Sequence, residues 1–197
     1  MKHLLLSFLF FLSFSFIYAQ DNYKDSILAY QHSYIENHGV VKGDEHQYLH
    51  FFAPDEIFRV TARFEKIYDA PWFKMPTSAN EYQVHRVYGI LHFSIHDTLL
   101  SLPVYQSQSL MKSKQYADYL FVPFTDKSSG EESYDNGRYI DLLLKDVETG
   151  SCILDFNRAY NPYCAYVTGK YSCPIPPREN DLPVAIHAGE MRFGKSH

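Results

Sequence analysis

The sequence contains few cysteines, only one tryptophan and, after residue 20, no apolar run long enough to span a membrane. It also lacks a run of basic residues, and its formal net charge is −5 at pH 7. A mildly acidic chain without a basic patch is poorly suited to bind nucleic acid. We therefore expect no nucleic-acid partner, and no stable membrane insertion of the mature chain.

Several motifs of common enzyme classes are missing as well. No Gly-x-Ser-x-Gly sequence is present, which argues against a hydrolase of the α/β type. The glycines are isolated, so no glycine-rich loop is available to hold phosphate groups. No two cysteines have the C-x-x-C spacing that is typical of many metal and redox sites. The sequence therefore identifies no cofactor.

The first 19 residues have the pattern of a cleavable secretory signal. A short basic start at Lys2 and His3 is followed by an uncharged apolar run over residues 4–17, and Ala19 supplies a small residue for cleavage. The run is shorter than a membrane-spanning helix, contains no cysteine for lipid attachment, and lacks the stop-transfer flank of a retained anchor. We expect residues 1–19 to be removed and the product to be exported, to the periplasm or the medium.

Residues 20–197 predict a single β-rich domain that begins with one helix. Apolar and tyrosine residues recur at helical spacing from Tyr23 to Tyr34, after a capping Asp21 or Asn22, and residues 37–39 end the pattern. We therefore expect one amphipathic N-terminal helix that covers part of a core.

Alternating apolar residues predict about seven strands in the rest of the domain. They cover residues 57–67, 87–95, 100–104, 119–124, 138–144, 151–156 and 182–187. The polar pair His96 and Asp97 predicts a hairpin turn, and the segment from Pro71 to Pro76 predicts a break. Since helices and strands do not alternate, a parallel sheet is disfavoured. We expect a mostly β fold, in which an antiparallel curled sheet, small barrel or sandwich carries one N-terminal helix.

Tyrosine and phenylalanine are abundant, with 17 and 15 copies respectively. Aromatic residues are favoured on the half-buried faces of strands, which is one explanation for their number. An aromatic-lined cleft is the other explanation. We favour the first, because it requires nothing beyond a β-rich fold.

The three cysteines predict one disulfide and one buried thiol. Cys164 and Cys173 lie in a loop-like, proline-rich segment, and an exported chain meets an oxidising compartment, so we expect them to be paired. Cys152 lies in an apolar strand pattern and is expected to be a buried free thiol. A metal or redox site is the alternative for the pair.

The segment of residues 157–181 is an unusually long loop for a compact domain, and long ordered loops are often functional. It is rich in Asn, Asp and Tyr, and contains four prolines that stiffen it. We predict that it binds a small molecule together with the strand that begins at Arg138. The simpler alternative is a structural lock, in which Asn and Asp side chains bind the local backbone. The candidate binding residues are Arg138, Asp155, Asn157, Asn161, Tyr163 and Asn180.

Three carboxylates are candidates for acid–base catalysis, namely Asp141, Asp155 and Glu179. Asp141 and Asp155 lie on neighbouring predicted strands, and a pair of carboxyl groups can act as acid and base when one pKa is raised. The alternative is that they form ion pairs with Arg138 or Arg158.

Two histidines are candidates for a metal site. His92 and His96 have the same parity on one predicted strand and should share a face, whereas His85 should lie on the other face. No third ligand is visible, so a surface pair is the preferred interpretation and no metal is expected.

Several segments together resemble the uncharacterised bacterial family DUF1684. They are FKMPTS at 73–78, YGILHF at 88–93, YLFVPFTD at 119–126, GRY at 137–139, DFNRAYNPYCAY at 155–166, CPIPPREN at 173–180 and AGE at 188–190, with Gly130 and Tyr134. The resemblance covers most of the mature chain. It implies that the polar loop belongs to a shared site or a shared structural lock, and it implies no particular activity. The resemblance also implies relatives without an export signal, in which the cysteine pair is not always a disulfide, and this keeps the metal or thiol alternative open.

The sequence thus favours an exported, soluble small-ligand-binding or accessory domain whose site lies in residues 155–180. A hydrolase that uses a carboxylate acid–base pair is the alternative. A metal-binding domain is the second alternative.

Overall fold

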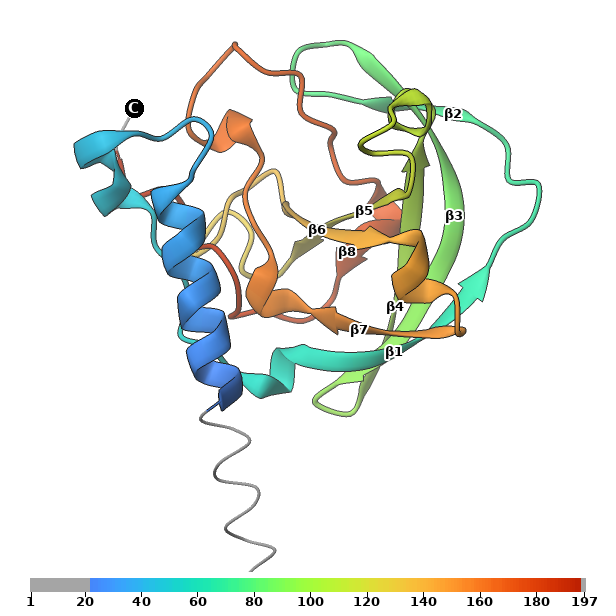
Figure 1. Ribbon diagram of the computed structural model, residues 1–197, viewed down its shortest axis with the longest axis horizontal. Helices are drawn as coiled ribbons and strands as arrows, with labels where there is room; N and C mark the ends of the chain where they lie inside the picture. The colour runs from blue at the N-terminus through green and yellow to red at the C-terminus, as the bar shows by residue number, and fades with distance from the viewer. Residues whose placement is uncertain (1–21, 196–197) are drawn as a thin grey trace, which may run out of the picture.

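A computed structural model describes residues 22–195 of the chain, so the predicted signal at residues 1–19 lies outside the described residues. The described part begins with a helix over residues 22–36, which confirms the predicted N-terminal helix. Ile27 and Gln31 of this helix are buried against the body of the protein, one turn apart on one face. Figure 1 shows the helix lying against one side of a curled sheet. Within residues 22–195, no helix is long and apolar enough to span a bilayer.

Eight strands form one sheet in the described residues. They are β1 (Arg59–Lys66), β2 (Phe73–Pro76), β3 (Tyr82–Ile95), β4 (Thr98–Ser107), β5 (Tyr119–Asp126), β6 (Arg138–Leu143), β7 (Ser151–Asp155) and β8 (Asp181–Leu182). Their order is β6-β5-β4-β3-β1-β7, with β2 added to β3, and β8 added to β5 as the one parallel pair. The connections contain seven short 3-10 turns, η1 to η7.

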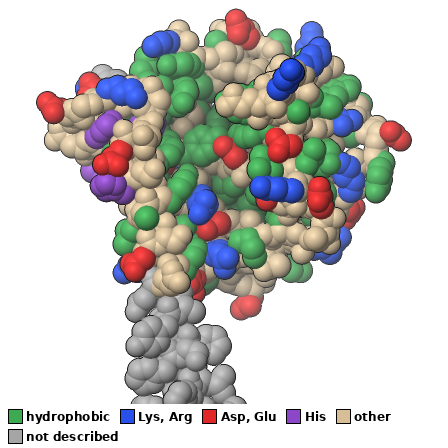
Figure 2. Space-filling model, viewed as in Figure 1, with side chains coloured by type: hydrophobic (Ala, Val, Ile, Leu, Met, Phe, Trp, Pro, Cys, Tyr) green, Lys and Arg blue, Asp and Glu red, His purple; other side chains and the backbone are tan. Residues whose placement is uncertain are grey.

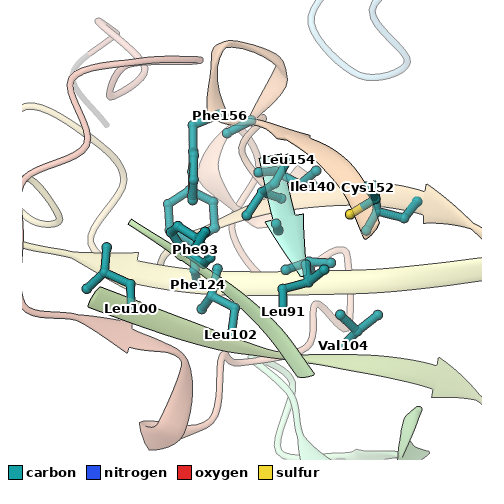
Figure 3. Close-up of a cluster of buried hydrophobic side chains, with 14 of the residues drawn as sticks. Leu91, Phe93, Leu100, Leu102, Val104, Phe124, Ile140, Cys152, Leu154 and Phe156 are labelled. Carbon is teal, nitrogen blue, oxygen red and sulfur yellow. The ribbon is translucent and has the colours of Figure 1, made fainter. Parts of the chain in front are cut away.

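The sheet curls around a single main core. Leu91, Leu102, Leu120, Ile140 and Leu154 come from five different strands, and all are at most 4% exposed. Figure 3 shows several of these side chains meeting on the inner face, together with a group of phenylalanines. The end strands β6 and β7 are joined through η4 (Leu144–Val147) and lie at the open side of the curl. This confirms the predicted mostly β, antiparallel, curled sheet with one N-terminal helix.

The predicted hairpin is formed by β3 and β4. Its two turn residues, His96 and Asp97, have φ angles of 46° and 61°. Positive φ at both central residues is typical of a type I′ turn, whose twist matches that of the flanking strands. His96 therefore lies in the turn and not on the strand, which corrects its predicted place beside His92.

A bulge in β3 between Val87 and Gly89 changes which residues face the core. On one side of it Leu91 pairs with Leu102 on the inner face, whereas on the other side Val87 pairs with Tyr105 on the outer face. One extra residue reverses the alternation of a strand. A prediction from strict alternation along the whole strand therefore assigns the residues before the bulge to the wrong face of the sheet.

The bulge has two consequences. His85 lies on the same outer face as His92, and not on the opposite face as parity predicted. Val87 joins a second apolar cluster on that outer face, which is built from Met75, Tyr105, Phe121 and Tyr139 with partly buried neighbours.

Two predicted elements differ from the structure at their ends. Residues 73–76, predicted as part of a break, form β2 and pair with β3, because β3 extends back to Tyr82 and offers a free edge. Of the predicted strand over residues 182–187, only Leu182 lies in β8, because the backbone N–H of Ile186 donates instead to the carboxylate of Asp126 at 3.0 Å.

Candidate functional site

The asparagines of the long loop are internal. Asn157, Asn161 and Asn180 are each 0% exposed. The Asn180 amide donates to the carbonyls of Pro103 and Pro123 at 3.0 and 2.7 Å, and its oxygen accepts from the Tyr105 hydroxyl at 2.7 Å. Asn180 thus fastens the loop to β4 and β5.

Asn157 and Asn161 fasten other segments in the same way. The Asn157 amide donates to the Asp55 carbonyl at 2.8 Å and to the Tyr23 hydroxyl at 2.9 Å, and its oxygen accepts from the Asp55 N–H. The Asn161 amide donates to the Met191 carbonyl at 2.8 Å. These groups hold the N-terminal helix and the C-terminal segment to the loop.

Arg138 is also fully buried, at 0% exposure. Its guanidinium forms an ion pair with Asp126 at 2.8 Å and donates to the carbonyls of Ile186, Ala188 and Glu190. A buried charge needs partners of this kind to be tolerated, although the Nε of Arg138 itself has none among the described residues. Arg138 therefore connects β6 to the C-terminal segment and has no open side for a ligand.

The three candidate carboxylates are not gathered in one place. Asp155 accepts hydrogen bonds from the Tyr23 hydroxyl and the Asn157 backbone N–H, and lies 4.0 Å from Arg158. Glu179 is exposed on η7 (Arg178–Asn180). Asp141 and Asp155 line one small hollow of about 220 Å³ between β6 and β7.

The candidate metal histidines lie apart from each other. His92 is 3.1 Å from Glu65, and the His96 ring packs edge-on against Phe58. No group of three or more His, Cys, Asp or Glu side chains arranged to hold a metal ion was found between residues 22 and 195.

A cleft of about 810 Å³ lies between the N-terminal helix, β6 and the long loop. Figure 2 shows it as an apolar hollow beside the helix. Eight tyrosines line it: Tyr30, Tyr34, Tyr116, Tyr119, Tyr139, Tyr160, Tyr163 and Tyr171. The aromatic-lined cleft, which we considered the less favoured explanation for the tyrosine content, is therefore present in the structure.

The tyrosines reach the cleft from separate segments for simple geometric reasons. Tyr30 and Tyr34 are four residues apart on the helix and thus on one face, with ring centroids 6.3 Å apart. Tyr160 is held beside β6 by a two-way backbone bridge to Tyr139, with N–O distances of 2.9 and 3.0 Å. Tyr119 lies on β5, diagonal to Asp141 of β6, since Asp141 pairs with Phe121.

Asp141 is the carboxylate of the cleft. Its Oδ1 accepts hydrogen bonds from the hydroxyls of Tyr119 and Tyr160, the second at 2.7 Å. Its Oδ2 receives no hydrogen bond from the described residues. Desolvation among the surrounding rings raises the pKa of the Asp141 carboxyl, although the two hydroxyl donors partly oppose this rise. The two tyrosines thus orient the carboxylate and leave one oxygen open.

His38, Tyr30 and Tyr34 of the cleft wall are neutral near pH 7. The Nδ1 of His38 accepts from the backbone N–H groups of Val40 and Val41, and burial lowers the pKa of His38 to about 4. Burial raises the pKa of Tyr30 to about 12, and raises the pKa of Tyr34 further. No lysine or arginine is among the residues that line the cleft.

Glu190 lies behind the cleft wall, at 0% exposure. Its carboxylate accepts from the hydroxyls of Tyr34 and Tyr166 at 3.1 and 2.7 Å, and from the backbone N–H of Asn161 at 2.8 Å. Burial raises the pKa of Glu190 to about 7 despite these bonds. Glu190 holds Tyr34 in its position in the wall.

The rim of the cleft is cross-linked. Cys164 and Cys173 form a disulfide with Cα atoms 6.3 Å apart, and Cys152 is a buried free thiol, which confirms both predictions. The rings of Tyr163 and Tyr171 lie 5.1 Å apart beside this bridge. The cross-link therefore keeps the outer tyrosines in a fixed position.

The sequence prediction placed the site between the long loop and the strand from Arg138, and the cleft lies there. The polar residues singled out for binding are mostly internal, and among them only Tyr163 lines the cleft, 44% exposed. The tyrosines were missed, although Tyr30 and Tyr34 at helical spacing and the tyrosines at 160, 163 and 171 gave a usable signal.

These features define a class: a β-rich, half-barrel domain with a cleft of ligand size at its open side. The model of the family described as "Protein of unknown function (DUF1684)" matches residues 44–191, and the chain belongs to this family. The chain is also similar to an uncharacterised protein of Haloarcula marismortui whose structure was solved by NMR in solution. The identity is 28%, the alignment covers 88% of this chain and 96% of that one, and the TM-score is 0.64. No curated protein matches the chain.

Proposed function

We propose that the protein is a binding domain for a small organic molecule, and that its site is the tyrosine cleft. The observation that carries this proposal is the convergence of eight tyrosines and one carboxylate on a single hollow of about 810 Å³. Small-molecule sites are commonly concave, about 300–1,000 Å³ in volume, and apolar or aromatic with a few placed polar groups.

The cleft wall suggests which ligands would fit. Ring faces bind flat or branched apolar groups, and the free oxygen of Asp141 accepts a hydrogen bond from a donor on the ligand. Backbone pairing of Tyr139 with Tyr160, and the disulfide at the rim, hold the wall in shape before a ligand arrives. Preorganisation of this kind lowers the entropic cost of binding.

We also propose that the domain acts after export, in the periplasm or outside the cell. The signal pattern of residues 1–19 supports this proposal, and so does the Cys164–Cys173 disulfide, which persists in oxidising compartments. Mass determination of the protein recovered from the periplasm and medium tests it. Cleavage after Ala19 is expected, and an intact N-terminus in the cytoplasm would contradict it.

Binding can be tested by filling the cleft. Ser33 is an exposed helix residue that lines the cleft, so Ser33→Trp should occlude it and leave the core untouched. Ala29 is exposed on the same helix and does not line the cleft, which makes Ala29→Trp the matched control. A thermal-shift screen of small aromatic and branched compounds should give ligands that bind the wild type and the control but not Ser33→Trp. Ligands that bind all three proteins equally would refute the proposal.

Acid–base hydrolysis is the second candidate function, and the accessible carboxyl of Asp141 with a raised pKa favours it. Asp155, in the adjoining hollow, is the nearest candidate for a second carboxyl. A screen of ester, amide and glycoside substrates tests this function. Turnover that survives in Asp141→Asn would exclude Asp141 as the acid or base.

A further inference from the structure

We propose that the occupant of the tyrosine cleft is an organic cation, a quaternary or protonated amine, with Asp141 as its counter-ion. This inference rests on the proposed function and adds the charge class of the ligand.

The first argument is the charge of the wall. Among the residues that line the cleft, Asp141 is the sole Asp, Glu, Lys or Arg, and His38 is held neutral by the two backbone N–H donors on its Nδ1. The tyrosines contribute hydroxyls and ring faces without charge. A ligand that enters therefore meets an environment of one sign, which favours a cation and disfavours an anion.

The second argument compares the partners of Asp141, which is exposed, with those of the buried carboxylates. Asp126 has Arg138 as its partner at 2.8 Å, and Asp155 has Arg158 at 4.0 Å. Glu190 accepts three hydrogen-bond contacts from two tyrosines and one from a backbone N–H, so its oxygens are occupied. Asp141 forms no ion pair with any residue between 22 and 195, and its Oδ2 accepts no hydrogen bond there. Asp141 is an exposed residue of the cleft lining, so a cation in the cleft can approach its free oxygen.

The third argument is the aromatic surface around that position. The ring of Tyr160 lies 5.9 Å from Tyr139 and 6.4 Å from Tyr34, so three rings are grouped beside the carboxylate that Tyr160 contacts. Ring faces attract ammonium groups, and cages of aromatic residues bind quaternary amines. A carboxylate and several tyrosine rings together provide both kinds of contact.

The chain already places its own cations on tyrosine rings near this region. The guanidinium of Arg158 lies 5.0 Å from the centroid of Tyr30, and that of Arg59 lies 5.3 Å from the centroid of Tyr23. Both arginines line a neighbouring hollow and neither lines the cleft, although Arg158 also lines the small hollow that Asp141 shares. Within residues 22–195, no cation of the chain packs on the rings of Tyr34, Tyr139 or Tyr160, so these rings are left for a cation that comes from outside.

The size and composition of the cleft favour an organic cation over a metal ion. Metal ions of the calcium or magnesium class need six or more oxygen ligands at short distance. The cleft offers one carboxylate and several hydroxyls spread over about 810 Å³, which suits a bulky, weakly hydrated ammonium group.

A pair of isosteric probes tests the proposal. Choline and 3,3-dimethylbutan-1-ol have the same shape, but only choline carries a positive charge. Titration calorimetry at constant ionic strength, with sodium chloride as the balancing salt, should give an affinity for choline about tenfold higher than for the alcohol. The cation preference should disappear in Asp141→Asn, whose side-chain oxygen can still accept from Tyr119 and Tyr160.

Glu179→Gln is the matched control, because it removes one negative charge from an exposed position outside the cleft. It should keep the tenfold preference for choline. Equal binding of both probes by the wild type, or no binding of choline at millimolar concentration, overturns the cation proposal. Neither result contradicts the proposed function of small-molecule binding. That proposal fails if the Ser33→Trp variant binds the screened ligands as the wild type does.

Discussion

The polar residues around Arg138 and those of the tyrosine cleft belong to one domain, but their hydrogen-bonding capacity is used differently. Asp126 and Arg138 are enclosed together, and the amides of Asn157 and Asn180 bond to internal partners. In the cleft, Asp141 is oriented by two tyrosines and retains a free oxygen. Buried polar groups that bond to internal partners stabilise a fold, whereas an accessible carboxylate with a free oxygen can hold a ligand.

The largest expected effect is that of removing Arg138. Arg138→Met should lower the free energy of unfolding by about 3–5 kcal/mol, because it leaves the buried carboxylate of Asp126 unpaired. Urea denaturation measures the change. The double variant Arg138→Met with Asp126→Leu should be less destabilised than the single one. If the single variant loses less than about 1 kcal/mol of unfolding free energy, then the buried residues around Arg138 do not stabilise the fold as this comparison requires.

The next effect concerns pH and Glu190. Its pKa of about 7 in the folded state lies above the usual 4.5, so the folded state binds the proton more tightly. The stability that it contributes is complete below about pH 4.5 and is lost as the pH rises through 7.

Glu190→Gln cannot titrate and should remove this dependence. The free energy of unfolding of the variant, relative to the wild type, should rise by about 3 kcal/mol between pH 4.5 and 8. Urea denaturation at several pH values measures it, with the exposed Glu179→Gln as control. A difference that stays constant with pH would show that Glu190 ionises normally.

Asn157→Ala comes third. It removes hydrogen bonds to Asp55 and Tyr23 and should cost about 2 kcal/mol of stability. The affinity of the folded protein for choline should not change, because Asn157 does not line the cleft. Calorimetry below the unfolding temperature checks this. If binding is lost while the fold persists, then the ligand contacts the asparagines as the sequence suggested.

The smallest effect on stability is expected for the residue with the largest expected effect on binding. Asp141→Asn should change the free energy of unfolding by no more than about 0.5 kcal/mol, because its carboxylate is open to the cleft and the amide oxygen can replace it. A decrease of several kcal/mol in the free energy of unfolding would instead show that Asp141 stabilises the fold, as Arg138 and Asn157 do.

Local patterns predicted the local features well. Helical spacing from Tyr23 to Tyr34, the His96–Asp97 turn and the cysteine pair each depend on nearby residues, and the structure contains all three. The bulge in β3 was missed, because one inserted residue leaves no strong mark in an alternating pattern.

The composition of the cleft was missed for a different reason. Tyr34, Tyr119 and Tyr160 are far apart in sequence, and only the curl of the sheet and the placement of the helix bring them together. For the asparagines, residue type predicted hydrogen bonding correctly but could not say whether the partners were internal or external.

The bulge between Val87 and Gly89 lets one strand serve both faces of the sheet. It turns Val87 outward beside Tyr105, so β3 packs against the apolar cluster that includes Tyr139 of the cleft wall. A Cβ atom at Gly89 would lie 2.2 Å from the ring of Phe64, so this glycine has little freedom to vary. A single extra residue thus lets β3 fill the interior with one half and support the floor of the cleft with the other.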